Sequence, residues 1–153
     1  MEEFNTLEKV KELFWSVNCE GNENCYFIAF KNSVKAKSGF KGGMEYPYNA
    51  LLINATENGL GIFYLNPEKI TDFLFAANIS KLKITENSYF FIPYENIREI
   101  KVRKFSIFNS KVKSLTIKTN DNKSHELLVN INESLIPYHN ENFSRFANKY
   151  EKK

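Results

Sequence analysis

The feature that most constrains the fold of this chain is the segment 88–150, where strand patterns follow one another and end in an amphipathic helix. Apolar and polar residues alternate within 97–105, 113–119 and 124–131, as expected for strands with one buried face. The apolar face of the helix at 140–150 consists of Phe143, Phe146, Ala147 and Tyr150. Such a helix must bury its aromatic rings. The pattern therefore predicts a strongly bent antiparallel sheet whose open end is closed by the helix.

The preceding part of the chain contains further strand patterns. Tyr26–Phe30 is apolar on both faces, which predicts a buried strand. Tyr48–Thr56 and Leu60–Leu65 predict a hairpin, because Asn58-Gly59 suits the positive backbone angles of a two-residue type I′ turn. Two shorter strands are expected at 81–85 and 89–92.

Two helices are expected outside the closing segment. Residues 5–18 have apolar side chains three and four positions apart, with Asn5 and Glu8 spaced as a capping box. Trp15 is interpreted as a packing anchor beside this apolar stripe. Residues 67–77 predict a short helix, because Asn66-Pro67 offers a cap residue followed by proline at the first helical position. The predicted fold class is therefore α+β.

The length of 153 residues fits a single domain, with 1–25 as an N-terminal helical extension and 26–150 as the sheet domain. Cys19 and Cys25 are expected to be reduced thiols, because domains built on disulfides are smaller and richer in cysteine. The N-terminus is acidic and interrupted, unlike a signal peptide. Apolar runs reach only five residues, whereas about 18 are needed to cross a bilayer. We therefore expect a cytoplasmic protein without a transmembrane segment.

Three stretches carry a resemblance to a known family: ALLINATENGLGIFYL (50–65), FFIPYENIREIKVRKF (90–105), and the strand–turn–strand–helix order of 113–150. Their order resembles the pleckstrin-homology-like (PH-like) superfold, particularly the small bacterial PH-like and GRAM-type domains. The resemblance implies a partly open β-barrel capped by a C-terminal helix. It also implies a binding module with ligands at the open end or along a sheet edge. The helices expected at 5–18 and 67–77 depart from this pattern. Phosphoinositide-binding members resemble one another in a basic pair on the second strand, and YNALLINAT (48–56) has no basic residue.

Basic residues are concentrated in the second half of the chain. Residues 98–118 contain seven bases and one acid, whereas residues 1–25 contain six acids and two bases. The basic strand is a candidate for contact with an anionic membrane surface, and the glycine- and lysine-rich loop at 31–43 is a candidate anion site. The candidate anion- or ligand-binding residues are Lys35, Lys37, Lys41, Lys101, Arg103 and Lys104.

The sequence contains no HExxH, Gly-x-Ser-x-Gly or other catalytic motif. His125 is interpreted as structural, on a strand face shared with Leu127 and Val129. His139 is interpreted as a capping or solvated residue just before the last helix. We therefore predict no catalytic residue, no metal site and no cofactor, and enzymatic activity is the less favoured hypothesis.

These observations favour a non-catalytic binding module. Its partner is expected to be another protein or a second copy of the chain, docking at a sheet edge, or an anionic membrane surface. Nucleic acid is disfavoured, because the net charge is only +3. The alternative is a small-molecule carrier or enzyme with an aromatic-lined cavity inside the sheet. A pocket of roughly 300 Å³ or more with converging polar groups would favour this alternative.

Overall fold

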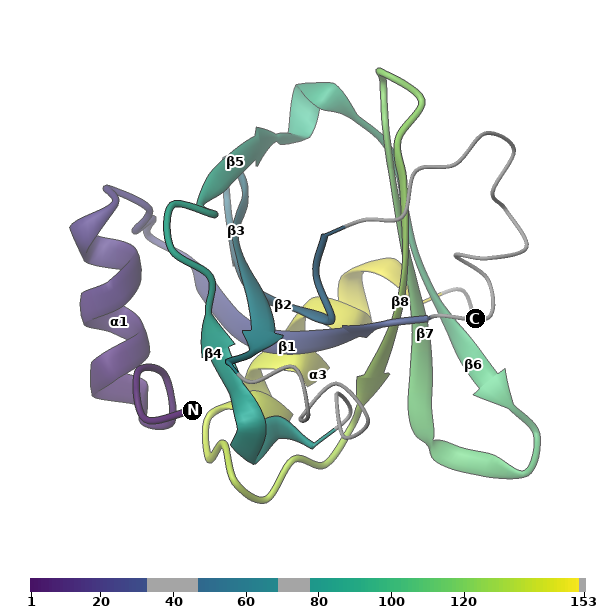
Figure 1. Ribbon diagram of the computed structural model, residues 1–153. Helices are drawn as coiled ribbons and strands as arrows, with labels where there is room; N and C mark the ends of the chain where they lie inside the picture. Colours follow the sequence, from purple (N-terminus) through teal and green to yellow (C-terminus); the bar gives the residue numbers. More distant parts are fainter. Residues whose placement is uncertain (33–46, 69–77, 152–153) are drawn as a thin grey trace.

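The computed structural model describes residues 1–32, 47–68 and 78–151 (Figure 1). In these residues the fold is α+β: a mostly antiparallel eight-stranded sheet, not closed into a barrel, with two helices. The elements in chain order are α1 (Leu7–Ser16), β1 (Asn24–Lys31), β2 (Ala50–Thr56), β3 (Gly59–Pro67), the 3₁₀ turn η2 (Ile79–Lys81), β4 (Leu82–Ile84), β5 (Phe90–Pro93), the 3₁₀ turn η3 (Tyr94–Asn96), β6 (Ile97–Ser106), β7 (Asn109–Thr119), β8 (Ser124–Asn130) and α3 (His139–Tyr150).

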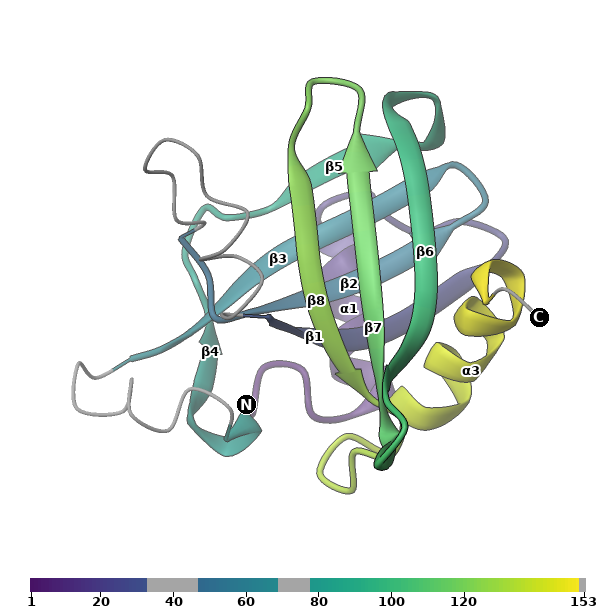
Figure 2. The same ribbon diagram turned by 90° about the vertical axis from the view of Figure 1, so that its right-hand side faces the viewer.

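The sheet bends sharply between β1 and β8. The strand order is β4-β3-β2-β1-β8-β7-β6, and β5 also pairs with β3. β1 pairs with β2 along Asn24–Phe30, but it meets β8 only through Phe30 and Lys31 at its very end. The sheet therefore divides into one half containing β1 to β5 and another containing β6 to β8, which face each other across the core (Figure 2).

The helix α3 closes the space between the two halves at one end, as the sequence predicted. Its Phe143 and Phe146 rings lie 5.3 and 4.7 Å from the ring of Phe27 in β1. All three side chains are buried, together with inner-face residues of β2, β7 and β8. Burying an aromatic side chain of this size contributes roughly 1.5–3 kcal/mol, so these contacts stabilise the position of α3.

Polar side chains of α3 also form hydrogen bonds with backbone groups of β1 along the part of the strand that does not pair with β8. Asn142 Oδ1 accepts a hydrogen bond from the backbone N–H of Tyr26 (2.9 Å), and His139 Nδ1 accepts one from Ile28 (3.1 Å). His139 Nε2 donates to the Asn130 carbonyl (2.6 Å). The interpretation of His139 as a solvated or capping residue was therefore wrong: this side chain is buried and replaces a missing strand partner.

The helix α1 covers the outer face of the half-sheet formed by β1 to β4 (Figure 1). Phe14 packs against Tyr26 and Phe63, with ring centroids 5.7 and 5.2 Å apart. This second core explains why β2 is buried on both faces, and it confirms both the N-terminal helix and the buried strand at Tyr26–Phe30.

Two details of α1 differ from the prediction. Thr6, rather than Asn5, caps the helix, because its side chain accepts a hydrogen bond from Lys9 N (3.2 Å). Trp15 is 70% exposed and is not a packing anchor. It lies next to Phe14 in the sequence, which places it outside the face that contacts the sheet.

The hairpin of β2 and β3 is confirmed, but its turn consists of Glu57-Asn58 and lies one residue earlier than predicted. Neither turn residue has a positive φ, so the turn is not of type I′. The Thr56 hydroxyl accepts from Asn58 N (3.1 Å) and donates to the Gly59 carbonyl (3.2 Å). Gly59 is instead required where β3 pairs with β5, because an added Cβ would lie 2.3 Å from the Ile92 carbonyl oxygen.

The strand β3 continues through Asn66 and Pro67, so the prediction that a helix begins at these residues was wrong. Asn66 does not act as a helix cap: its Oδ1 accepts from Asn49 N (3.0 Å) and its Nδ2 donates to Thr85 Oγ1 (2.8 Å). Pro67 pairs with Leu82 at the strand end, where a missing N–H is tolerated. The remainder of the predicted helix, 69–77, lies outside the described residues.

Candidate functional site

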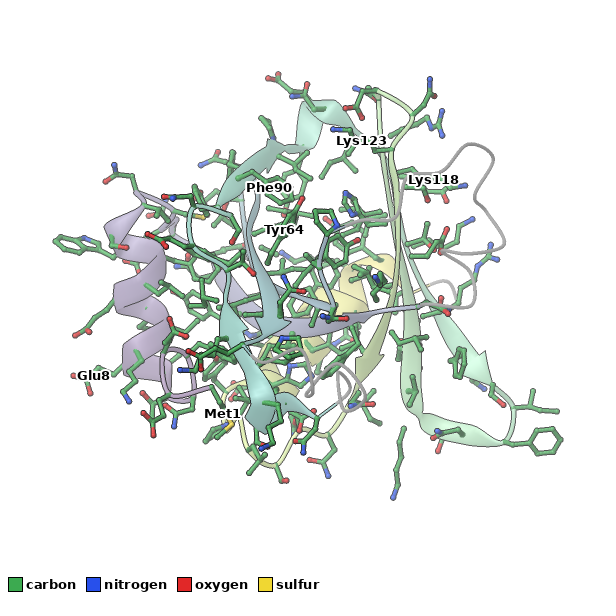
Figure 3. The ribbon with its side chains drawn as sticks, viewed as in Figure 1. Met1, Glu8, Tyr64, Phe90, Lys118 and Lys123 are labelled. Carbon is green, nitrogen blue, oxygen red and sulfur yellow. The ribbon has the colours of Figure 1, made fainter. Side chains whose placement is uncertain are left out.

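A pocket of about 690 Å³ opens between the two halves of the sheet, at the end where β5, η3 and the β7–β8 turn meet. Figure 3 shows Tyr64 and Phe90 between the two halves, with Lys123 at the turn on the opposite side. One wall of the pocket is apolar and aromatic, and the other is polar. The residues used below to describe it are Tyr64, Phe90, Asn96, Asp121, Lys123 and His125.

The aromatic wall follows from the alternation of β3. Leu60 and Ile62 point into the inner core, and Tyr64 continues the same face beyond them. Phe90 in β5 meets the Tyr64 ring edge-on at 5.6 Å. Tyr48 also packs against Tyr64, with ring centroids 5.1 Å apart. The inner face of the sheet therefore ends in a row of aromatic rings that borders the pocket.

The polar wall is built by the turn between β7 and β8. Asn122 adopts a left-handed conformation (φ 67°), which an asparagine tolerates at low cost, and Thr119 Oγ1 donates to the Asp121 carboxylate. The turn is tied to η3, because Asn120 N donates to Asn96 O (2.9 Å) and Asn120 Nδ2 donates to Glu95 O (2.8 Å). These bonds hold the polar groups in position opposite the aromatic wall.

The inner end of the pocket, at His125, is uncharged, and its mouth, at Asp121 and Lys123, is charged. His125 is 4% exposed, and its Nδ1 shares a 2.7 Å hydrogen bond with the Tyr48 hydroxyl. Burial lowers the pKa of His125 to about 4, so the imidazole is neutral at pH 7. At the mouth, Lys123 Nζ lies 3.7 Å from Asp121 Oδ2, and the hydrogen bond from Thr119 lowers the pKa of the Asp121 carboxyl.

This arrangement suits a flat, mostly apolar molecule with a hydrogen-bonding edge. The rings would contact its faces, and the buried polar side chains would orient its edge. The pocket volume of about 690 Å³ exceeds the roughly 300 Å³ that favours the small-molecule alternative. In the three described ranges, no cluster of three or more His, Cys, Asp or Glu side chains is arranged to hold a metal ion.

Three of the six basic residues singled out in the sequence, Lys101, Arg103 and Lys104, are described by the structure, and none of these three lines the pocket. Lys35, Lys37 and Lys41 lie outside the described residues. Lys101 lies on the outer face of β6, where its Nζ is 3.2 Å from Glu99 Oε1. Arg103 has the same alternation phase as Lys101, and Lys104 has the opposite phase and pairs in register with Lys113. Arg103 and Lys104 are both exposed, near the far end of β6 from the pocket.

The sequence did not predict the pocket residues, because each of them also fits the pattern of its own strand or turn. Tyr64 and Phe90 fit strand patterns, and residues 120–123 fit a turn. The one available signal was His125, a titratable side chain on an otherwise apolar strand face. The interpretation of His125 as structural agrees with the structure, because His125, Leu127 and Val129 are all buried. The structure also shows that His125 lines the pocket.

Comparison with known proteins gives no match for this chain, either to a protein-family model, to a curated protein or to a solved structure. Both cysteines are free thiols, as predicted, and both are buried. Neither helix in the described part of the chain is long and apolar enough to cross a membrane.

Proposed function

We propose that this protein is a non-catalytic binding domain that holds a small organic ligand between the two halves of its sheet. The observation that carries the proposal is the pocket of about 690 Å³ with an aromatic wall facing a polar one. Ligand sites are typically concave and mostly apolar, with a few polar groups that fix orientation.

The chemistry of the pocket defines the ligand class. His125 and its hydrogen-bond partner Tyr48 place no charge at the inner end of the pocket, so a neutral edge of the ligand is favoured there. A charged or zwitterionic group is better placed at the mouth, near Asp121 and Lys123, where solvent screens it. We therefore expect a flat aromatic or alicyclic ligand with a polar end.

We also infer that the chain is a divergent bacterial member of the PH-like superfold. The succession of antiparallel strands followed by a closing helix supports this inference. The additional strand β5 and the helix α1 are departures from that pattern. The two free thiols support a reducing compartment, and we propose the cytoplasm as the location.

The proposal is tested with 1-anilinonaphthalene-8-sulfonate, a flat aromatic probe with one polar end, in a fluorescence titration of the folded protein. Phe90→Ser removes part of the aromatic wall and should weaken probe binding about tenfold or more. Phe105→Ser is the matched control, because Phe105 is 48% exposed and lies outside the pocket lining. This control should bind the probe as the unmodified protein does.

Equal probe affinity in the two variants would contradict the proposal. Circular dichroism and a thermal melt of each variant verify that the sheet remains folded. Native mass spectrometry of the purified protein supplies a second measurement, since a co-purified small molecule that is lost in Phe90→Ser identifies the natural ligand class.

A further inference from the structure

The turn between β6 and β7 carries the most exposed apolar side chains of the described residues. Ser106 pairs with Asn109, so Ile107 and Phe108 occupy the two central positions of the turn. Ile107 is 87% exposed, Phe108 is 92% exposed, and the neighbouring Phe105 is 48% exposed. We call Phe105–Phe108 the apolar tip.

Folding does not require apolar residues at these positions. Turn positions favour Gly, Asn, Asp, Pro and Ser, for conformational and hydrogen-bonding reasons that Ile and Phe do not share. The hydrogen bonds that support this turn come from its polar neighbours: Ser106 Oγ accepts from Phe108 N (3.1 Å) and Asn109 Oδ1 accepts from Lys111 N (3.1 Å). The side chains of Ile107 and Phe108 are exposed to water, which is unfavourable for apolar groups, and they do not pack against the core. This exposure indicates a contact with another molecule.

The apolar tip also projects beyond the rest of its half-sheet. β8 pairs with β7 only from Val112 onward, so the end of the hairpin continues as a two-stranded ribbon. Figure 1 shows this hairpin extending away from the body of the molecule. The apolar tip comprises the four residues 105–108, whereas a specific protein–protein interface takes roughly 20–30 residues from each partner.

Cations surround the apolar tip. Residues 103–113 contain four basic residues and no acidic residue. Arg103, Lys104 and Lys111 are exposed, and none of them forms an ion pair with any residue that the structure describes. Lys113, farther from the turn, is bound to Glu151. Lysine is depleted in the cores of protein interfaces, whereas apolar side chains flanked by cations are typical of segments that lie in a bilayer interface.

We propose that the apolar tip inserts Ile107 and Phe108 into the surface of an anionic lipid bilayer, while Arg103, Lys104 and Lys111 contact the headgroup phosphates. The ligand pocket lies beyond the opposite end of β6, next to Asn96, and the ten residues of this strand separate the two sites. Attachment would therefore leave the pocket accessible from solution.

The test is co-sedimentation with vesicles of phosphatidylcholine mixed with phosphatidylserine, compared with vesicles of phosphatidylcholine alone. The protein should bind the mixed vesicles more strongly, and less so as salt is raised. The double variant Ile107→Ser/Phe108→Ser should bind at least about tenfold more weakly, because both inserted side chains are lost. Lys104→Gln and Lys111→Gln should each weaken binding about fivefold, the effect of one cation near such a surface.

Matched controls use exposed residues of α1. Trp15→Ser removes an exposed aromatic ring, and Lys9→Gln with Lys11→Gln removes two exposed cations. Both controls should bind vesicles as the unmodified protein does. Insertion is followed independently with Phe108→Trp in a Trp15→Phe background, which leaves one tryptophan, at the tip. Its emission should shift to shorter wavelength with mixed vesicles.

Three results would overturn the proposal: no binding to the mixed vesicles, equal binding by the double-serine variant, or an unshifted emission of Trp at position 108. Self-association that depends on the apolar tip, seen by analytical ultracentrifugation without vesicle binding, would assign the tip to a second copy of the chain instead. All of these substitutions fall on exposed residues, and thermal melts of each variant verify folding.

Discussion

At the scale of single residues, the buried histidines show how position changes the role of a side chain. His125 lies at the start of β8, next to the pocket, and His139 accepts a hydrogen bond from the backbone N–H of Ile28 in β1. Burial lowers the pKa of both imidazoles. Each therefore stays neutral in the folded protein under conditions where it would begin to be protonated in the unfolded chain.

This difference makes stability depend on pH. For His125 the folded pKa of about 4 lies below the ordinary value of 6.5. Between these values the unfolded state binds more protons, so the free energy of unfolding falls as pH falls. From about pH 7 to about pH 5, His125 alone should account for a loss of about 2 kcal/mol. Urea denaturation at both pH values measures this loss.

The variant His125→Gln isolates the contribution of this residue. It should show a pH dependence smaller by about 2 kcal/mol over the same interval, while the share of His139 remains. The comparison uses the difference between two pH values, so a uniform loss of stability in the variant does not affect it. An unchanged pH dependence would show that His125 is not the titrating group.

At the scale of elements, the two described helices pack against different parts of the bent sheet. α3 fills the opening between the halves, and α1 covers the outer face of β1 to β4. The strands β1 and β2 are consequently buried on both sides, although their pairing is antiparallel. The N-terminal helix is therefore part of the packed structure, joined to it through Phe14.

The packing of α1 gives a paired prediction on adjacent residues. Phe14 is fully buried and contacts Tyr26 and Phe63, so Phe14→Ala should lower the free energy of unfolding by about 3–5 kcal/mol. Trp15→Ala changes a 70% exposed side chain of the same helix and should alter it by no more than about 0.5 kcal/mol. Chemical denaturation measures both. Similar effects in the two variants would contradict this placement of the helix.

At the scale of the whole molecule, the pocket and the apolar tip lie at opposite ends of the β6–β8 half-sheet. Side chains this far apart, without shared partners, are expected to act additively. Phe90→Ser should therefore leave vesicle binding unchanged, and Ile107→Ser/Phe108→Ser should leave probe affinity unchanged. Measuring both variants in both assays checks this independence, and a crossed effect would indicate that the sheet couples the two ends.

The sequence predicted the elements well because their patterns are local. Alternating strands, the hairpin of β2 and β3, and the aromatic face of α3 each depend on neighbours within one element. Predictions failed where a distant segment decides the outcome. Pro67 stays extended because it pairs with Leu82, and Gly59 is needed for the close approach of β5 rather than for the turn.

Among the described residues, the sequence by itself determined most of the strands and both helices, with Asn66-Pro67 as the exception, because periodicity records burial along each element. The tertiary structure alone decided where the two halves of the sheet separate and how far β8 extends along β7. The first places Tyr64, Phe90 and His125 around a pocket. The second leaves Ile107 and Phe108 in solvent. Both depend on contacts between residues far apart in the chain, which no local pattern encodes.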